Sequence, residues 1–280
     1  MTYRVELAEG SGFCFGVRRA IELALATVQQ EGVAYSLGPI IHNPQEIDRL
    51  ARQGLRVVAS LTDVPVGAPL IIRSHGAAPE VLEEARRRGV RLIDATCPLV
   101  QRAQRRARDL AEAGYRVVVV GEAEHPEVQA IVAQAPGAVV VEDGNSLEEL
   151  RTSRRLGVVV QTTQSPVAFR HVVGRLLELE PRELRLHNTI CSATLHRQQA
   201  TRALARRADA MVVVGGRNSA NTRRLVELCA AEGVAVHHIE TAGELEPGWF
   251  AGAQLVGVTA GASTPAWVVD RVLGWLGGRG

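Results

Sequence analysis

Short apolar runs rich in β-branched residues alternate along the chain with longer amphipathic stretches. The runs have the length and composition of buried strands, and the stretches carry apolar residues at helical spacing. Such alternation predicts an α/β protein with parallel sheets. The expected strands span residues 3–8, 33–37, 55–58, 69–73, 90–93, 115–120, 138–141, 156–161, 184–186, 210–214, 235–239 and 255–258. Expected helices span residues 16–30 and 44–53, and further helices fill most of the remaining gaps.

Three of the four cysteines hold the same place in this pattern. Cys14, Cys97 and Cys191 each follow an expected strand and precede a helix, so that one cysteine opens each third of the chain. A polar residue stands 28 residues after each of them, at the next strand end: His42, His125 and Ser219. A third polar strand end follows in each case, at residues 73–76, 161–163 and 259–264. The equal spacing indicates an internal repeat.

The repeat divides the chain into three expected α/β domains, which span residues 1–96, 97–190 and 191–280. No low-complexity linker separates them, so the boundaries are expected in short loops. Ligands of parallel sheets bind outside the carboxyl ends of the strands, where helix N-termini present N–H groups to anions. We therefore expect the polar strand ends of the three domains to converge on one central site.

Composition excludes several classes of chemistry. The sequence contains no lysine, so all 32 basic residues are arginine, which excludes Schiff-base catalysis and the lysine of a P-loop. A formal net charge of +2 and 4% aromatic residues are not typical of a nucleic-acid binder. The N-terminus lacks the pattern of a secretion signal, and no apolar run has the length of a membrane span, so we expect a cytoplasmic protein.

The cysteines favour metal binding or catalysis over disulfides in that compartment. Three thiolates from three repeats are one ligand fewer than an iron–sulfur cluster usually takes. One iron of a [4Fe–4S] cluster would then have no protein ligand and could bind substrate. Zinc bound by three cysteines is an alternative that the spacing leaves open. Cys229 lies inside an amphipathic stretch and is expected to be a buried core residue.

The polar strand ends favour an anionic substrate. Six short hydrogen-bonding side chains occupy equivalent positions: His42, His75, His125, Ser219, Asn221 and Ser263. Such a set suits a polyanion such as a diphosphate, bound without lysine or an acidic metal-binding pair. Glu127 is the only carboxylate at such a position, and we expect it to be a proton donor.

Two other motifs are weaker indications of function. The glycines at positions 10, 12 and 16 follow a strand and open a helix, but the next strand ends without the acid that a dinucleotide ribose needs. The triplet His125-Pro126-Glu127 is similar to a zinc-deaminase motif, but the downstream cysteine pair of those enzymes is missing.

Nine short motifs follow one another between residues 12 and 265: GFCFGV (12–17), GPIIHN (38–43), SHG (74–76), DATCP (94–98), HPEV (125–128), QTT (161–163), TICSAT (189–194), NSANT (218–222) and TAGASTP (259–265). Together and in this order they resemble the 4-hydroxy-3-methylbut-2-enyl diphosphate reductases, which act last in the non-mevalonate isoprenoid pathway. Two departures are Glu122, where the family often has histidine, and Ala220, where it often has a second serine.

The resemblance implies three pseudo-threefold-related α/β domains with parallel sheets, in a trefoil around a central [4Fe–4S] cluster. It implies that the cluster is bound by Cys14, Cys97 and Cys191. It implies that the diphosphate is bound by His42, His75, Ser219, Asn221 and Ser263. It implies that the substrate hydroxyl is bound and protonated with the help of Thr162, His125 and Glu127.

The implied reaction removes the allylic hydroxyl with two electrons and two protons and gives isopentenyl and dimethylallyl diphosphates. A ferredoxin or flavodoxin is the expected electron donor, because no flavin or nicotinamide site is evident in the sequence. One alternative is another cluster-dependent hydro-lyase or synthase of the same three-unit architecture, such as a quinolinate-synthase-like protein. A non-enzymatic metal or redox sensor is a second alternative, although the anion-binding side chains would then have no purpose.

Overall fold

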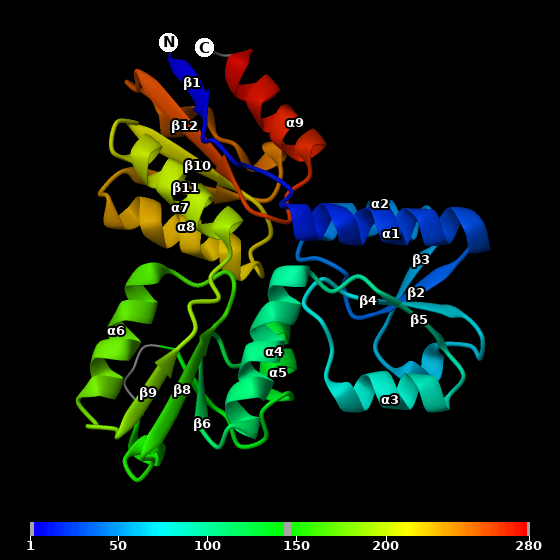
Figure 1. Cartoon of the computed structure of the whole chain (residues 1–280). Coiled ribbons are helices and arrows are strands. Elements are labelled where there is room, and N and C mark those ends of the chain that lie inside the picture. Colours follow the sequence, from blue (N-terminus) through cyan, green and yellow to red (C-terminus); the bar gives the residue numbers. More distant parts are fainter. Residues whose placement is uncertain (1–2, 143–146, 279–280) are drawn as a thin grey trace. The chain divides into compact units, whose positions relative to one another are not determined.

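The structure is a computed structural model that describes residues 3–142 and 147–278. In these residues the chain forms three four-stranded sheets, and every strand pairing in them is parallel (Figure 1). The expected α/β class is thereby confirmed. The arrangement of three units around a common centre stays a prediction.

The first sheet contains β2 (Ala34–Leu37), β3 (Leu55–Val58), β4 (Pro69–Ile72) and β5 (Arg91–Asp94) in the order β3-β2-β4-β5. The second contains β6 (Arg116–Val120), β7 (Val139–Val141), β8 (Arg155–Val160) and β9 (Glu183–Leu186) in the order β7-β6-β8-β9. The third contains β1 (Arg4–Leu7), β10 (Ala210–Val214), β11 (Ala235–Ile239) and β12 (Leu255–Ala260) in the order β1-β12-β10-β11.

Helices connect the strands. They are α1 (Phe15–Glu31), α2 (Pro44–Ala51), α3 (Pro79–Arg87), α4 (Pro98–Glu112), α5 (Pro126–Val132), α6 (Pro166–Leu177), α7 (Ser192–Ala205), α8 (Ala220–Ala231) and α9 (Ala266–Gly277). Short 3₁₀ helices lie in the loops: η1 (Leu61–Asp63), η2 (Glu148–Leu150), η3 (Ala242–Glu244) and η4 (Pro247–Phe250). Five of the α-helices, α2 to α6, begin at proline, whose fixed φ and missing N–H suit the first helical position.

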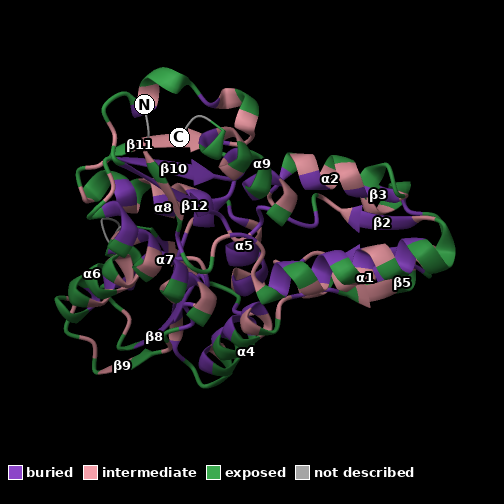
Figure 2. Cartoon of the chain, turned by 90° about the horizontal axis from the view of Figure 1, so that it is seen from above, coloured by how far each residue is buried: buried purple, intermediate pink, exposed green. Residues whose placement is uncertain are grey.

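All twelve expected strands and both of the delimited helices are present, with ends within two residues of the expected ones. The central strands were recognisable because they are apolar on both faces. For example, every residue of β10 and β12 is buried, as the purple ribbons of Figure 2 show. The helices show an exposed face in the same view, which is the pattern of a helix-covered parallel sheet.

The N-terminal strand belongs to the last sheet and not to the first. β1 pairs with β12, with Arg4 opposite Leu255 and Leu7 opposite Val258. The structure therefore differs from the expected first domain of residues 1–96, because its first strand completes the sheet of residues 191–280. Hydrophobic periodicity identifies a strand but does not say which partner it pairs with. The domain boundaries at residues 97 and 191 stay a prediction.

The internal repeat is confirmed by the sheet topology. Starting from the edge strand that precedes a cysteine, the three orders are β1-β12-β10-β11, β5-β4-β2-β3 and β9-β8-β6-β7. In each sheet the cysteine strand pairs with the strand that precedes the third polar motif. Each cysteine therefore follows an edge strand that lies beside the strand of the third polar motif.

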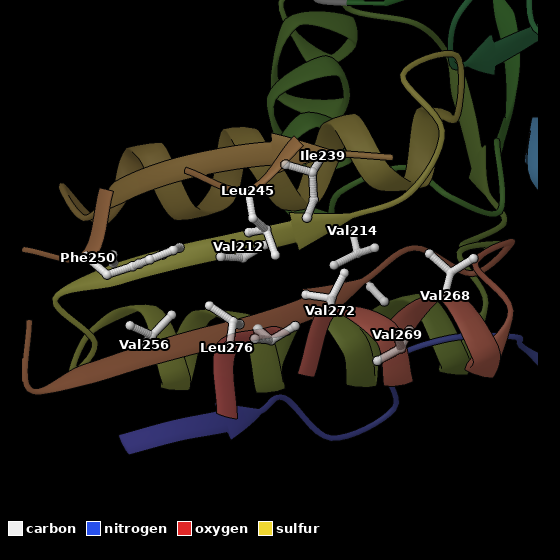
Figure 3. Packing of buried hydrophobic residues seen from close by; sticks show 13 residues of the cluster. Val212, Val214, Ile239, Leu245, Phe250, Val256, Val268, Val269, Val272 and Leu276 are labelled. Carbon is white, nitrogen blue, oxygen red and sulfur yellow. The ribbon is translucent and has the colours of Figure 1, made fainter. Parts of the chain in front are cut away.

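Two compact units can be described separately. One consists of residues 1–18, 41–49 and 192–280 and contains the third sheet, and the other consists of residues 19–40 and 50–191 and contains the first two. In the unit with the third sheet, α9 packs Val268, Val269, Val272 and Leu276 against a core that includes Val214 (Figure 3). This packing fixes the loop between β12 and α9, which carries Ser263. No helix among the described residues combines the length and apolarity that a membrane crossing requires.

Candidate active site

The three cysteines lie in equivalent turns between an edge strand and a helix. Cys14 and Cys191 directly precede α1 and α7, and Cys97 is the N-cap residue of α4. The backbone N–H of each cysteine donates to a carbonyl in the loop after the neighbouring strand, at distances of 3.1, 3.0 and 3.1 Å for the pairs Cys14–Ala262, Cys97–Ser74 and Cys191–Thr162. All three cysteines are partly exposed.

This shared anchoring places a sulfur at the carboxyl end of each sheet and at a helix N-terminus. The helix dipole there favours negative charge, as a thiolate ligand requires. Cys229 is different, because it is fully buried in a hydrophobic cluster of the third sheet. Burial, with a smaller contribution from Glu232, raises the pKa of its thiol to about 12. The prediction that Cys229 is a core residue is confirmed.

Glu127 is a buried carboxylic acid in the first turn of α5, with 2% of its surface exposed. Thr162 donates two hydrogen bonds to it, from its backbone N–H to Oε1 at 2.6 Å and from its hydroxyl to Oε2 at 2.9 Å. Burial raises the pKa of Glu127 to about 7, although both hydrogen bonds act in the opposite direction. The acid and its carboxylate are therefore both populated near neutral pH, which suits a general acid.

Thr162 also connects this acid to a cysteine turn. Its carbonyl accepts the Cys191 N–H, while its N–H and hydroxyl bind Glu127. The spacing of the sequence motifs does not predict this connection. It follows from the pairing of β8 with β9, because residues 161–163 and 187–191 extend from neighbouring strands.

His125 caps α5 and is buried. Its Nδ1 accepts the backbone N–H of Glu127 at 3.1 Å. A neutral imidazole that accepts at Nδ1 carries its proton on Nε2, so His125 can donate a hydrogen bond from the far side of the ring. The rings of His75 and His125 lie edge to face with centroids 5.4 Å apart. One compact unit thus brings His75, His125, Glu127 and Thr162 into one connected group.

The other compact unit collects the remaining polar residues. The hydroxyl of Ser263 donates to the carbonyl of His42 at 2.9 Å. Ser219 caps α8, accepting from Thr222 N–H at 3.3 Å, and Asn221 lies buried in the first turn of the same helix. The Asn221 Nδ2 is buried and has no hydrogen-bond partner among the described residues. An unsatisfied amide donor at a helix N-terminus fits an anionic ligand.

A close approach of two loops fixes the position of His42. A Cβ atom on Gly216 would lie 2.7 Å from the His42 carbonyl oxygen, so only glycine fits there. Asn43, and not His42, caps α2, because its side chain accepts the Glu46 N–H at 2.9 Å. In the first repeat the capping residue therefore lies 29 residues after the cysteine, and His42 precedes it.

Two arginines that the sequence interpretation missed support the cysteine turns. Arg197 is buried and donates to the carbonyls of Gly10 and Gly12, at 2.9 and 2.7 Å. Arg19 donates to the carbonyls of Asp94 and Thr96, both at 3.2 Å. Each lies on the helix that follows one cysteine and holds the backbone that leads to another. The only sequence signal was an arginine five or six residues after a cysteine, which is hard to separate from a solvated helix face.

Comparison with known proteins identifies the family. Residues 5–277 match the model of the family described as LytB protein. The chain belongs to the LytB family. Among LytB relatives, the 4-hydroxy-3-methylbut-2-enyl diphosphate reductase of Geobacter metallireducens is 51% identical over 268 residues, which cover 95% of this chain and 94% of the relative. The reductase of the same name from Pelobacter propionicus is 48% identical, and 98% of each chain is covered.

Solved structures agree with this assignment. The structure of (E)-4-hydroxy-3-methyl-but-2-enyl diphosphate reductase, described as the terminal enzyme of the non-mevalonate pathway, matches with a TM-score of 0.73 at 41% identity, covering 99% of this chain and all of that one. The E-1-hydroxy-2-methyl-but-2-enyl-4-diphosphate reductase from Plasmodium falciparum matches with a TM-score of 0.93 at 28% identity, covering 99% of this chain and 88% of that one. The resemblance found in the sequence motifs is confirmed.

The LytB family uses an iron–sulfur cluster, and the donor set of this chain fits one. Thiolates are the preferred ligands of such clusters. The three partly exposed cysteines have the same backbone anchoring and the same helix N-terminal position, whereas Cys229 is enclosed by apolar side chains. The structure thus separates three candidate ligands from one structural cysteine on physical grounds.

Proposed function

We propose that the chain removes the allylic hydroxyl of 4-hydroxy-3-methylbut-2-enyl diphosphate and yields isopentenyl and dimethylallyl diphosphates. The reaction breaks one C–O bond and forms one C–H bond. It consumes two electrons and two protons and releases one water molecule. The observation that carries the proposal is the connection of a buried acid, Glu127, through Thr162 to the turn of Cys191.

Cys14, Cys97 and Cys191 would bind a [4Fe–4S] cluster, which supplies electrons and one iron without a protein ligand. Their equivalent anchoring in three sheets of one topology supports this assignment. The electrons would come from an external carrier, for which a ferredoxin or flavodoxin is our proposal. A cytoplasmic location stays a prediction from the sequence.

Glu127 would supply a proton to the substrate. Its pKa of about 7 keeps a substantial fraction of the side chain protonated at neutral pH. Thr162 binds both carboxyl oxygens, so the carboxyl group keeps a fixed orientation. The Thr162 hydroxyl and the Nε2 side of His125 are the groups we assign to the substrate hydroxyl. His125 is oriented for this by the hydrogen bond that its Nδ1 accepts.

The diphosphate would be bound by neutral donors and helix N-termini. We assign it to His42, His75, Ser219, Asn221 and Ser263. The buried Nδ2 of Asn221, which lacks a partner among the described residues, supports this role most directly. The N–H groups at the start of α8 add further donors for an anion.

The proposal is tested by anaerobic reconstitution with iron and sulfide, followed by an assay with a strong artificial reductant. We expect the amount of 4-hydroxy-3-methylbut-2-enyl diphosphate consumed to equal the combined amount of isopentenyl and dimethylallyl diphosphates formed. Glu127→Gln should lower turnover by about 10² or more, the range for loss of a general acid, while substrate still perturbs the iron spectrum. Glu124→Gln is the matched control, because Glu124 is an exposed acid in the loop that precedes α5. Equal turnover in both variants would contradict the assignment of Glu127 as the general acid.

The ligand assignment has its own experiment. Single replacements by serine at Cys14, Cys97 and Cys191 should each reduce bound iron and sulfide after reconstitution, whereas Cys229→Ser should retain them. A Mössbauer spectrum of the unaltered protein should show one iron site distinct from the others. Retention of a full cluster in any of the first three variants would contradict the assignment, and zinc without iron would support the alternative metal.

A further inference from the structure

The segment that carries His42 groups with the third sheet and not with its neighbours in the chain. Residues 41–49 belong to the compact unit that contains the third sheet, whereas the chain on either side of them belongs to the other unit. Contacts with distant residues of its own unit therefore hold this segment in place. Two of these contacts are side-chain hydrogen bonds to the stretch that leads into α9.

Glu46 is a buried carboxylate to which neither the cluster nor the substrate assigns a role. It lies in the first turn of α2, and 1% of its surface is exposed. The indole Nε1 of Trp267, in the first turn of α9, donates to its Oε2 at 3.1 Å. Arg49 donates to both carboxyl oxygens, at 3.0 Å from Nε and 2.6 Å from Nη2. Burial of an unpaired charge is unfavourable, so these donors stabilise the carboxylate at this position.

The bond between Trp267 and Glu46 is the second of two that join the same pair of segments. In the first, the Ser263 hydroxyl donates to the His42 carbonyl at 2.9 Å. Trp267 and Glu46 each stand four residues beyond these partners in their own segments. The loop of Ser263 is itself fixed to the third sheet, since the Thr264 hydroxyl donates to the last carbonyl of β10 at 3.0 Å. One bond alone would let the segment of His42 pivot, whereas two bonds fix its direction.

The first turn of α2 transmits the position of Glu46 to His42. The Asn43 side chain accepts the Glu46 N–H at 2.9 Å, and the Asn43 carbonyl accepts the Ile47 N–H at 3.1 Å. These bonds close one capped turn, which His42 directly precedes. A shift of Glu46 after loss of the Trp267 bond would therefore move His42 as well.

We propose that Glu46 and Trp267 are positioning residues that hold His42 in the orientation in which it binds the diphosphate. The inference rests on the diphosphate site of the proposed function. The pair with Arg49 neutralises Glu46, so the carboxylate can orient this segment with little repulsion of an anion. Affinity depends on such support, because a binding group that is displaced by a fraction of an ångström loses much of its contact with the substrate.

The test compares KM and kcat of the reconstituted protein with those of its variants. Trp267→Phe keeps an aromatic ring and removes the donor, and Glu46→Leu removes the acceptor. Each should raise KM for 4-hydroxy-3-methylbut-2-enyl diphosphate about tenfold, as for one hydrogen bond to a charged group, and leave kcat and bound iron unchanged. Glu46→Gln keeps an acceptor oxygen for Trp267 and should restore most of the affinity. Trp275→Phe is the matched control, because Trp275 lies on the same helix and its ring packs on Phe250.

Action through His42 gives a sharper measurement. In a His42→Ala background, Trp267→Phe should have no further effect on KM, because no imidazole is left to position. A further rise of about tenfold in that background would overturn the proposal. Unchanged KM in both Trp267→Phe and Glu46→Leu would also overturn it. Thermal unfolding checks the folding of each variant, and a lower midpoint with an unchanged KM would assign the contact to helix packing alone.

Inorganic diphosphate separates this inference from the proposed reaction, because its binding needs no turnover. Calorimetric titration should show about tenfold weaker binding to Trp267→Phe than to the unaltered protein. The same result in a protein without reductase activity would support the positioning role and contradict the proposed reaction. Weaker binding to Asn221→Ala but not to Trp267→Phe would retain the diphosphate site and overturn the positioning role. Absence of binding to the unaltered protein would overturn both assignments.

Discussion

Arg197 donates a hydrogen bond of 2.7 Å from its Nη2 to the backbone carbonyl of Gly12, which lies 185 residues earlier in the chain. A second bond, from Nε to the carbonyl of Gly10, is 2.9 Å long. Gly12 has a φ of +91° and stands two residues before Cys14. A buried guanidinium on the helix after Cys191 therefore holds the left-handed backbone that leads to Cys14.

Replacement of Arg197 by methionine should destabilise this turn, because it keeps the apolar stem and removes the donors. Hydrogen bonds to charged groups contribute about 1.5 to 3 kcal/mol each, so we expect the free energy of unfolding to fall by about 3 kcal/mol. Bound iron after reconstitution should fall as well. Urea unfolding and iron analysis measure the two effects. Arg206→Met is the control, since Arg206 makes only an exposed pair with Glu232, which contributes about 0 to 1 kcal/mol.

The raised pKa of Glu127 predicts a pH-dependent stability. The folded chain holds this proton up to a pH of about 7, whereas the unfolded chain releases it near the ordinary value of 4.5. The stabilising contribution is therefore complete below about pH 4.5 and is lost as pH rises through 7. From the shift, the loss is about 3 kcal/mol. Glu127→Gln should remove it, so urea unfolding of both proteins from pH 5 to pH 8 should give curves that diverge in this window. Parallel curves of unfolding free energy against pH would contradict the raised pKa of Glu127.

Turnover should depend on the same proton. If Glu127 donates in its protonated form, kcat should decline above a pH of about 7 and reach a tenfold loss for each further pH unit. The pH dependence of electron transfer from the external reductant must be measured separately as a control. A kcat that is constant from pH 6 to pH 9 would exclude Glu127 as the donor in a rate-limiting proton transfer.

His125 should have separable effects on stability and turnover. His125→Ala removes the cap of α5, which should lower the free energy of unfolding by about 1 kcal/mol. Asparagine can cap the helix but lacks Nε2, so His125→Asn should restore the stability and leave turnover low. Thermal unfolding and single-turnover kinetics distinguish the two effects. Recovery of turnover in His125→Asn would show that His125 acts only as a cap.

Substrate affinity should depend on the unpartnered amide of Asn221. Loss of one hydrogen bond to a charged group costs about 1.5 to 3 kcal/mol, which corresponds to a KM about 10 to 150 times higher for Asn221→Ala. The cluster spectrum should be unchanged. Asn218→Ala is the control, because Asn218 is an exposed residue of the loop that precedes α8. Unchanged KM in Asn221→Ala would count against a diphosphate at the start of α8.

The strands were predictable because local composition determines them. Val117 to Val120 and Met211 to Val214 are buried on both faces, and continuous apolar runs of this length are typical of parallel strands. The pairing of β1 with β12 was not predictable, because an apolar run indicates a strand without specifying which strand lies beside it. The sequence therefore predicted three sheets correctly but placed the N-terminal strand in the wrong one.

The candidate site likewise combines residues that have a local sequence signal with contacts that have none. Cys14, Cys97 and Cys191 were distinguishable from Cys229 because the pattern puts them in turns and Cys229 in a helix. The burial that raises the pKa of Glu127, and its contacts with Thr162, depend on residues 35 positions apart and have no local signal. Arg197 has no sequence signal that separates it from a surface residue, because a charged residue on a helix is usually solvated.

The pairing of β1 with β12 has a consequence for the order in which the chain can mature. The Cys14 turn is synthesised well before Ala262, whose carbonyl accepts the Cys14 N–H in the folded chain. The strands of the first two sheets are all synthesised by residue 186, whereas the third sheet must wait until β12 has left the ribosome. The turn of Cys14 therefore gains its backbone anchor only after the turns of Cys97 and Cys191 have been synthesised.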